Sequence, residues 1–191
     1  MTAHQDVLDF WFGAAGTPQH GRRRSEWFRK SDAFDAEIRA RFLPLYESAV
    51  SGDLDAWRDA PESLLALIVV LDQFPRNMFR NDARAFAADA QALDCALCMA
   101  DAGWDGKLAP LERWFAYLPL EHAEDMAMQE RALERFGDLA RDEAYADTLD
   151  WARRHHAVIA RFGRFPHRNE LLGRASTAEE IAFLAQPGSR F

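Results

Sequence analysis

Hydrophobic residues recur at three- and four-residue intervals along most of this chain, whereas the alternation that marks β-strands is nearly absent. Ser31 or Asp32 can cap a helix that Gly52 ends, and an earlier stripe predicts a short helix that ends at Gly13. The members of that earlier stripe are Val7, Leu8, Trp11 and Phe12. The pattern therefore indicates helices from the start of the chain.

Residues 61–74 are apolar on nearly every side of the helix that they predict. Such a helix belongs at the centre of a helical domain, surrounded by the other helices. Pro61 suits its first turn. Pro75 disfavours helical backbone at Phe74, so we expect the helix to end there.

The second half of the chain continues the helical pattern. The segments expected to be helical are residues 82–102, residues 111–117, residues 119–139, a stretch that ends at Gly163, and residues 177–185. The stretch before Gly163 has an apolar face that includes Trp151 and His155, and Ser176-Thr177-Ala178-Glu179 has the signature of a capping box. About eight helices with short connections predict one all-α domain of antiparallel helix pairs, spanning residues 1–191.

Charge is distributed unevenly along the chain. The net charge of −8 argues against nucleic acid as a partner, because phosphate binding needs a basic surface. Residues 153–174 hold six Arg and three His but one acid, whereas residues 121–150 hold ten acids against three Arg. The basic stretch can bind an anion, or it can pair with the acidic helix before it.

No segment indicates export or a membrane anchor. The N-terminus lacks the basic region of a signal peptide, and the longest apolar run, residues 64–71, is far shorter than the roughly 20 residues that span a bilayer. Cys95 and Cys98 lie in a helical stretch with no strand before it, so we interpret them as small core residues. We therefore expect a cytoplasmic protein.

The most distinctive feature of the sequence is a near-repeat. Phe74-Pro75-Arg76-Asn77 follows one apolar helix, and Phe165-Pro166-His167-Arg168-Asn169 follows another far downstream. Each places a guanidinium and an amide beside an aromatic residue and a proline. If the fold brings the two together, they form a pocket lined by two Arg, two Asn and a His.

The stretch Leu71-Asp72-Gln73-Phe74-Pro75-Arg76-Asn77-Met78-Phe79-Arg80 resembles the bacterial proteins grouped as domain of unknown function 924. Further matches, from near residue 7 to near residue 184, are Phe10-Trp11-Phe12-Gly13, Tyr117-Leu118-Pro119-Leu120-Glu121-His122, Glu124-Asp125 and Phe162-Gly163-Arg164-Phe165-Pro166-His167-Arg168-Asn169. The resemblance implies a TPR-like helical superhelix and no established activity, although no TPR repeat period is visible. Where the family often reads His-Ser-Glu, this chain reads His122-Ala123-Glu124, which excludes a serine nucleophile there.

The charged and amide side chains near the two motifs are the candidate ligand-binding groups. Guanidinium forks suit carboxylate or phosphate, and amides both donate and accept hydrogen bonds. The candidates are Asp72, Arg76, Asn77, Arg80, His122, Glu124, Asp125, His155, Arg164, His167, Arg168 and Asn169. The alternative is structural, because Arg and Asn beside helix ends satisfy carbonyls and Arg pairs with acids.

Histidine and carboxylate groups in this set suggest two kinds of chemistry. His122 or His155 beside Asp72, Glu124 or Asp125 can act as a general base. The set also contains metal-ligand types, but His122 and Glu124 do not share a helical face, so we predict no metal and no cofactor. The sequence has no nucleophile motif, Gly-rich phosphate loop or nucleotide-binding unit.

Two functional classes remain open. We favour a binding or interaction module for a small anionic ligand or a partner peptide, and the alternative is a small hydrolase or transferase acting on a phosphorylated or carboxylated metabolite. Aromatic residues can line a peptide groove in helical superhelices, although at helical spacing they more often form core. Those residues are Trp11, Phe12, Trp27, Phe28, Trp114, Phe115 and Tyr117. We find no signal for an oligomeric state.

Overall fold

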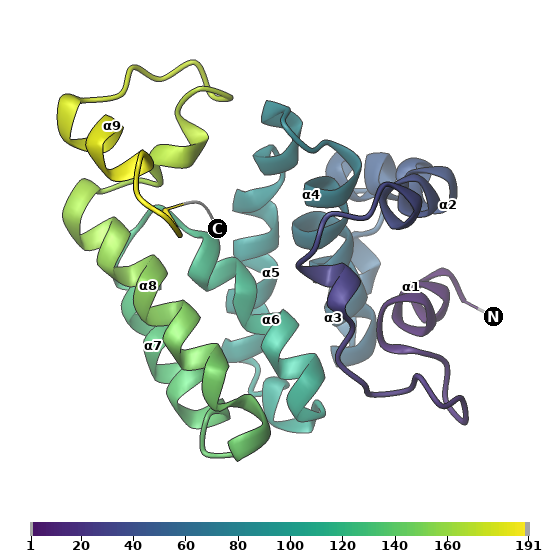
Figure 1. Cartoon of the computed structure of the whole chain (residues 1–191). Helices are drawn as coiled ribbons and strands as arrows, with labels where there is room; N and C mark the ends of the chain where they lie inside the picture. Colours follow the sequence, from purple (N-terminus) through teal and green to yellow (C-terminus); the bar gives the residue numbers. More distant parts are fainter. Residues whose placement is uncertain (1, 190–191) are drawn as a thin grey trace. The chain divides into compact units, whose positions relative to one another are not determined.

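The computed structural model describes residues 2–189, and the regular secondary structure of these residues is all helical (Figure 1). The expected all-α fold is therefore confirmed. The α-helices of this part of the chain are α1 (Ala3–Phe12), α2 (Asp32–Ser51), α3 (Pro61–Ile68), α4 (Phe74–Met78), α5 (Asp89–Asp101), α6 (Pro110–His122), α7 (Met126–Leu139), α8 (Ala146–Phe162) and α9 (Ala178–Leu184).

Backbone contacts divide the chain into two compact units. Unit 1 comprises residues 2–80 and 84–119, and unit 2 comprises residues 81–83 and 120–189. The boundary falls inside α6, after Pro119, and each unit is described by itself below. The single domain over residues 1–191 and the TPR-like superhelix stay predictions.

The core of unit 1 is built around α3, as its apolar pattern predicts. Residues 63–68 of this helix are all buried, and α3 packs against α1 and α5. Aromatic side chains from other elements complete the core, and Trp11, Phe74 and Phe115 lie among the largest fully buried side chains. α2 packs beside α4.

The expected helix end at Pro75 is wrong, because the chain continues helically through it. Between α3 and α4 lies one turn of π-helix, η3 (Val69–Gln73), and Phe74 has φ −58° and ψ −42°. The amide of Phe74 donates to the carbonyl of Val69, five residues earlier. A proline ring normally clashes with the carbonyl four residues before it, and the wider π-turn relieves this crowding.

The start of the next helix also differs from expectation. The helix expected from residue 82 begins at Asp89, after the 3₁₀ turn η4 (Ala83–Phe86), and Asn81 adopts a left-handed conformation with φ 60°.

Cys95 is buried as expected and Cys98 is half-buried. Burial raises the pKa of the Cys95 thiol to about 11, which leaves it protonated and unreactive.

The predicted acidic helix starting at Pro119 is also wrong. Pro119 lies inside α6, which ends at His122, and α7 begins at Met126. Asp125 ends the break between them: it has extended backbone and its carboxylate accepts a hydrogen bond from the Met128 amide. The turn falls at Asp125 because this side chain can cap α7.

Gln129, on the first turn of α7, closes the end of α6. Its buried amide nitrogen Nε2 donates to the carbonyls of Glu121 and Ala123, at 2.7 and 2.8 Å. The last carbonyls of a helix have no partner within the helix. The Gln129 amide therefore fixes the position of the α6 terminus, which carries Glu121 and His122.

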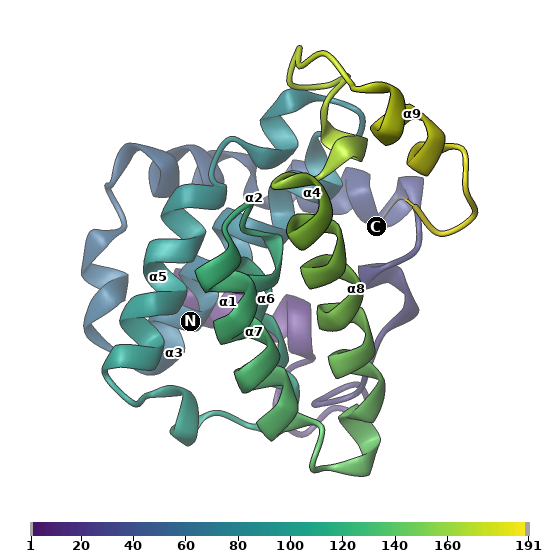
Figure 2. The same cartoon turned by 90° about the vertical axis from the view of Figure 1, so that its left-hand side faces the viewer.

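Unit 2 is built on the antiparallel pair α7 and α8, which lie side by side in two views (Figures 1 and 2). Gly163 ends α8 as predicted, in a left-handed conformation with φ 68°. The predicted capping box starts α9, with Thr177 and Glu180 bonding each other's backbone amides. Trp151 departs from expectation: it is 45% exposed, beneath the guanidinium of Arg154 at 4.7 Å.

Within residues 2–189, no helix combines the length and the apolar composition that a membrane span requires.

Replacing Gln129 by Leu should lower the free energy of unfolding by about 1–3 kcal/mol, because it leaves buried carbonyls of α6 without a donor. Urea denaturation measures the change. The matched control is Gln91→Leu, since Gln91 is exposed and makes one hydrogen bond, to the carbonyl of Val50. An equal loss in both variants would contradict the role given to Gln129.

Candidate functional site

The two motifs of the near-repeat fall in different units. Unit 1 contains Asp72, Arg76, Asn77 and Arg80. Unit 2 contains the other candidate residues, which are His122, Glu124, Asp125, His155, Arg164, His167, Arg168 and Asn169. The convergence of the two groups into one pocket stays a prediction.

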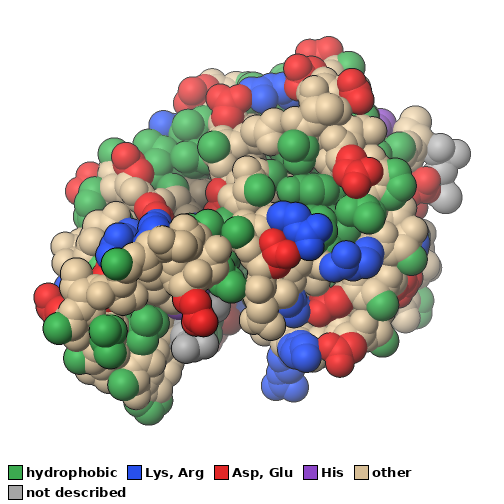
Figure 3. Space-filling view, turned by 90° about the horizontal axis from the view of Figure 1, so that it is seen from above, with side chains coloured by type: hydrophobic (Ala, Val, Ile, Leu, Met, Phe, Trp, Pro, Cys, Tyr) green, Lys and Arg blue, Asp and Glu red, His purple; other side chains and the backbone are tan. Residues whose placement is uncertain are grey.

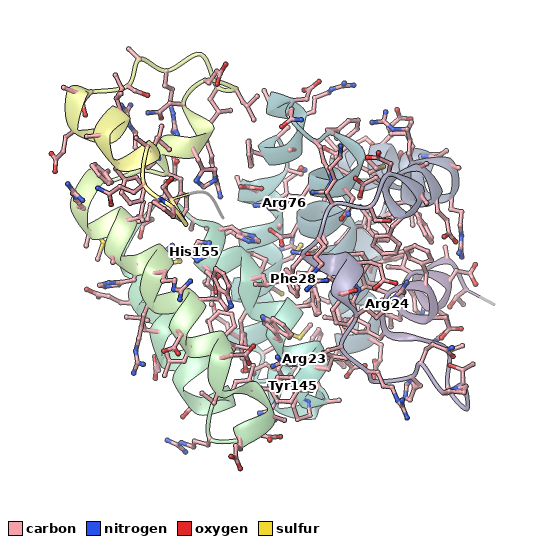
Figure 4. The ribbon with its side chains drawn as sticks, viewed as in Figure 1. Arg23, Arg24, Phe28, Arg76, Tyr145 and His155 are labelled. Atoms are coloured by element: carbon pink, nitrogen blue, oxygen red, sulfur yellow. The ribbon has the colours of Figure 1, made fainter. Side chains whose placement is uncertain are left out.

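In unit 1, Arg76, which is labelled in Figure 4, forms ion pairs with two carboxylates. Its Nη1 lies 3.2 Å from Oδ1 of Asp72 and donates to Oδ1 of Asp89 at 2.9 Å. Burial acts to lower the pKa of Arg76, but Asp72 and Asp89 outweigh it and the pKa is raised. The fully buried Asp72 also accepts a 2.6 Å hydrogen bond from the Gln73 amide. The π-turn thus places a buried carboxylate where a guanidinium and an amide can satisfy it.

Asn77 and Arg80 both bind Asp35 of α2. The amide of Asn77 donates to Oδ1 of Asp35 at 2.7 Å, and Arg80 forms an ion pair with the same carboxylate. These contacts tie α4 to α2. The contacts of Arg76, Asn77 and Arg80 are those of the structural alternative raised by the sequence.

In unit 2, Glu124 joins three distant parts of the chain. Its carboxylate accepts two hydrogen bonds from Arg174, at 2.6 and 2.9 Å, and one from the backbone amide of Phe165 at 2.7 Å. Burial acts to raise the pKa of Glu124, but the donors from Arg174 and Phe165 outweigh it and the pKa is lowered. We call these three residues the Glu124 clip.

Arg164 and Asn169 have similar structural contacts. Arg164 makes a two-point ion pair with Glu180, whose side chain is buried, and the amide of Asn169 donates to Ser176 while its oxygen accepts from Arg174. The Arg164 hydrogen bond, followed by that of the Thr177 amide, lowers the pKa of Glu180 to about 2 against the effect of burial. Acidic and basic side chains also adjoin one another on the face seen in Figure 3.

Two imidazoles and one guanidinium of unit 2 gather around a buried aromatic ring, and a third imidazole lies beside one of them. The ring of Phe165 lies 5.5 Å from that of His155 and 5.7 Å from that of His167, and the Arg168 guanidinium lies 4.6 Å from its centre. The His122 ring is 6.3 Å from that of His155. We call His122, His155, His167 and Arg168 the histidine cluster.

Each member of the histidine cluster is positioned by a definite element. His122 ends α6 and His155 lies on α8 (Figure 4), while His167 and Arg168 belong to the 3₁₀ turn η7 (Pro166–Arg168). Arg168 is 6% exposed and donates from Nη2 to the carbonyl of His122 at 3.1 Å. This bond links η7 directly to the end of α6.

Glu121 orients His155 within the cluster. Its Oε1 lies 3.0 Å from Nδ1 of His155, and both side chains are buried. The same Nδ1 lies 3.0 Å from the carbonyl of Trp151, one helical turn earlier. Two oxygen acceptors at Nδ1 favour the proton there, which leaves Nε2 as the nitrogen that can accept a proton.

His167 is held in its neutral form. Burial is the main cause, and the nearby charge of Arg168 adds to it, so the pKa of His167 falls to about 3. The cluster therefore combines a permanent cation, Arg168, with an imidazole that is neutral near pH 7.

Within residues 2–189, no group of three or more His, Cys, Asp or Glu side chains is arranged to hold a metal ion. Asp125, one of the carboxylates considered for such chemistry, caps α7 through its contact with the Met128 amide.

Sequence reasoning missed four residues that matter to these sites. Asp35 and Asp89 hold the arginines of unit 1, Glu121 orients His155, and Arg174 completes the Glu124 clip. Glu121 lies within a motif of the resemblance and Arg174 ends the basic stretch, so both carried a signal. Asp35 lies on an ordinary polar helix face and carried none.

Comparisons with known proteins place the chain among its relatives. Residues 7–188 match the profile of a family described as bacterial protein of unknown function, DUF924. The chain belongs to this family. The DUF924 chain is also similar to the solved structure of ATU0120, a protein of unknown function from Agrobacterium tumefaciens, with 39% sequence identity and a TM-score of 0.84 over 95% of this chain and 96% of that one. No curated protein matches it significantly.

The ionisation of Glu180 should make the free energy of unfolding depend on pH in the acidic range. Because the folded-state pKa of Glu180 lies below its ordinary value of 4.5, its contribution is present above that value and is lost as the pH falls toward about 2. The difference in unfolding free energy between the wild type and Glu180→Gln should therefore shrink over this range in urea titrations at several pH values. Glu179→Gln is the control, because Glu179 is 62% exposed, and a gap independent of pH would contradict the assignment.

Proposed function

We propose that this DUF924 protein binds a small carboxylate or phosphate anion at the histidine cluster of unit 2. The observation that carries the proposal is the gathering of two imidazoles and a buried guanidinium on the ring of Phe165, with the imidazole of His122 beside that of His155. Helix packing alone does not call for four nitrogen-rich side chains at one place. Guanidinium and imidazole groups are the donors that proteins use to hold anions.

The other arginines near the motifs are held by carboxylates of the chain. Arg76, Arg80 and Arg164 each bind carboxylates of the chain itself, so an anion would have to displace those partners. At the histidine cluster, Arg168 donates to a backbone carbonyl and lies over an aromatic ring, and its charge also acts on Glu124. His122 and His167 are half-buried residues.

An anion at the cluster would also change the protonation of His167. This imidazole is neutral because burial and Arg168 lower its pKa to about 3. A nearby negative charge favours the protonated form and raises the pKa. Binding should therefore take up protons, and the affinity for an anion should rise as the pH falls.

Sulfate and succinate are suitable probes, and calorimetric titration measures their dissociation constants. Arg168→Gln should weaken binding about 10- to 100-fold, as expected for loss of a charge-assisted hydrogen bond of about 1.5–3 kcal/mol. Sulfate remains a dianion between roughly pH 5 and pH 8, so a rise in its affinity toward the lower pH reports protonation of the protein.

Two matched variants serve as controls for anion binding. Arg161→Gln removes an exposed arginine that pairs with Glu179, and His156→Gln changes the residue next to His155. Both should bind sulfate as the wild type does. Absence of binding in the wild type, or equal weakening in Arg161→Gln and Arg168→Gln, would contradict the proposal.

A second candidate function is a small hydrolase or transferase, and the Glu121–His155 pair favours it. A carboxylate at Nδ1 that orients an imidazole is the arrangement of a general base. With Ala123 in place of the serine often found in the family, the attacking group would be water or a substrate hydroxyl. Arg168 would then hold the anionic part of the substrate.

If the pair acts as a base, His155→Gln should lower the hydrolysis of p-nitrophenyl phosphate or p-nitrophenyl acetate by about 100-fold or more. Glu121→Gln should also lower the activity, because it removes the carboxylate that orients His155. His156→Gln is the control. Wild-type protein that hydrolyses neither ester, yet binds sulfate, would leave the binding function and contradict the enzymatic one for these substrate classes.

A further inference from the structure

A short segment of unit 1 reverses the acidic character of the chain. Residues 22–30 read Arg-Arg-Arg-Ser-Glu-Trp-Phe-Arg-Lys, with five cations and one acid in a chain of net charge −8. Two adjacent aromatic residues, Trp27 and Phe28, lie between the cations. Cationic and aromatic side chains in one segment favour a ligand that is both negatively charged and planar.

Phe28 is the exception among the aromatic residues expected to form core. Trp27, Trp114 and Phe115 are buried, but Phe28 is 56% exposed. Its ring nevertheless stacks on that of Trp114, at 5.1 Å between centroids and 24° between planes. The ring of Phe115 is nearly parallel to it as well, at 6.2 Å and 14°. Phe28 is therefore an exposed ring that the core holds in a fixed orientation.

The cations beside this ring have different roles. Arg24 anchors the segment: it donates to the carbonyl of Phe10 at 2.7 Å and lies over the ring of Phe34. The guanidinium of Arg23 lies 4.5 Å from the centre of the Trp114 ring, the same ring on which Phe28 stacks. Figure 4 shows Arg23, Arg24 and Phe28 with their side chains. Arg23 thus places a positive charge beside the aromatic stack.

Two buried indoles in the same aromatic group have unused donors. The Nε1 atoms of Trp11 and Trp27 are buried and have no hydrogen-bond acceptor among the described residues. Their rings stack on each other at 5.7 Å, and Trp27 also contacts Phe28. The ring of Phe115, 4.7 Å from that of Trp27, offers at most a weak π acceptor. Buried donors are nearly always paired, so these two are exceptions within the aromatic group.

We propose that the stack of Phe28 on Trp114, with Arg23, is a binding site for a small molecule that carries an aromatic ring and an anionic group. The ring of the ligand stacks on the exposed face of Phe28, and its anionic group interacts with the guanidinium of Arg23. A purely apolar ligand would not use the guanidinium.

This site lies in unit 1 and is independent of the anion site proposed at the histidine cluster of unit 2. Adenosine monophosphate is the test probe because it joins an aromatic base to a phosphate. Adenosine and inorganic phosphate separate the two contributions. Calorimetric titration gives the dissociation constants, and quenching of tryptophan fluorescence reports stacking near Trp27 and Trp114.

Phe28→Ala should weaken binding of adenosine monophosphate about 5- to 100-fold, in line with the loss of one base–aromatic stack. Phe28→Tyr keeps a planar ring and should retain affinity. Arg23→Ala should lower the affinity for adenosine monophosphate to that for adenosine, and the affinity for adenosine should stay unchanged. Ile181→Ala, at a side chain that is 60% exposed in unit 2, is the control for loss of an exposed hydrophobic group.

The results that would overturn the proposal are distinct. Nucleotide binding that is unaffected by both Phe28→Ala and Arg23→Ala would place the ligand elsewhere, and its loss in Arg168→Gln alone would assign it to the histidine cluster. Equal affinities for adenosine and adenosine monophosphate would show that Arg23 does not bind the anionic group. An oligo(dA) probe that binds while the mononucleotide does not would show a nucleic-acid surface instead. Circular dichroism of each variant establishes that it is folded.

Discussion

A charged group buried in a protein must meet its partners inside the fold, and this constraint governs the structure around Asp72. The carboxylate is fully buried, and Gln73 and Arg76 satisfy it from positions one and four residues along the same helix. The π-turn brings these side chains together and lets the helix pass Pro75. Arg76 then reaches Asp89, so one buried charge helps to position both α4 and α5.

Elements with strong local patterns could be predicted from the sequence, whereas elements set by distant partners could not. The burial of α3, the Gly163 helix end and the Thr177 capping box follow from neighbouring residues alone. Pro75 misled the prediction because its usual effect assumes regular helical geometry, which the π-turn changes. Asp125 was read as a ligand candidate rather than a cap because its carboxylate suits both roles.

The candidate site shows the same division. One motif contains His167 and Arg168, and His155 stood among the candidates on the apolar face of its helix; these three side chains gather around Phe165. They gave no indication that Arg174, 50 residues from Glu124, would hold that carboxylate. Motif spacing identifies residue types suited to a chemistry, but only the fold decides which cations are already neutralised by the chain. Carboxylates of the chain neutralise Arg76, Arg80 and Arg164.

The Glu124 clip has a consequence for how unit 2 opens. Phe165, whose amide the clip holds, is also the ring around which His155, His167 and Arg168 are arranged. Arg174 adds a second attachment, to the carbonyl of Phe165. Release of Glu124 would therefore remove one of several attachments of the segment after Gly163, because Arg164 would still pair with Glu180 and Arg168 would still donate to the carbonyl of His122. The clip thus holds Phe165 by its backbone, whereas these other contacts hold its neighbours in the chain.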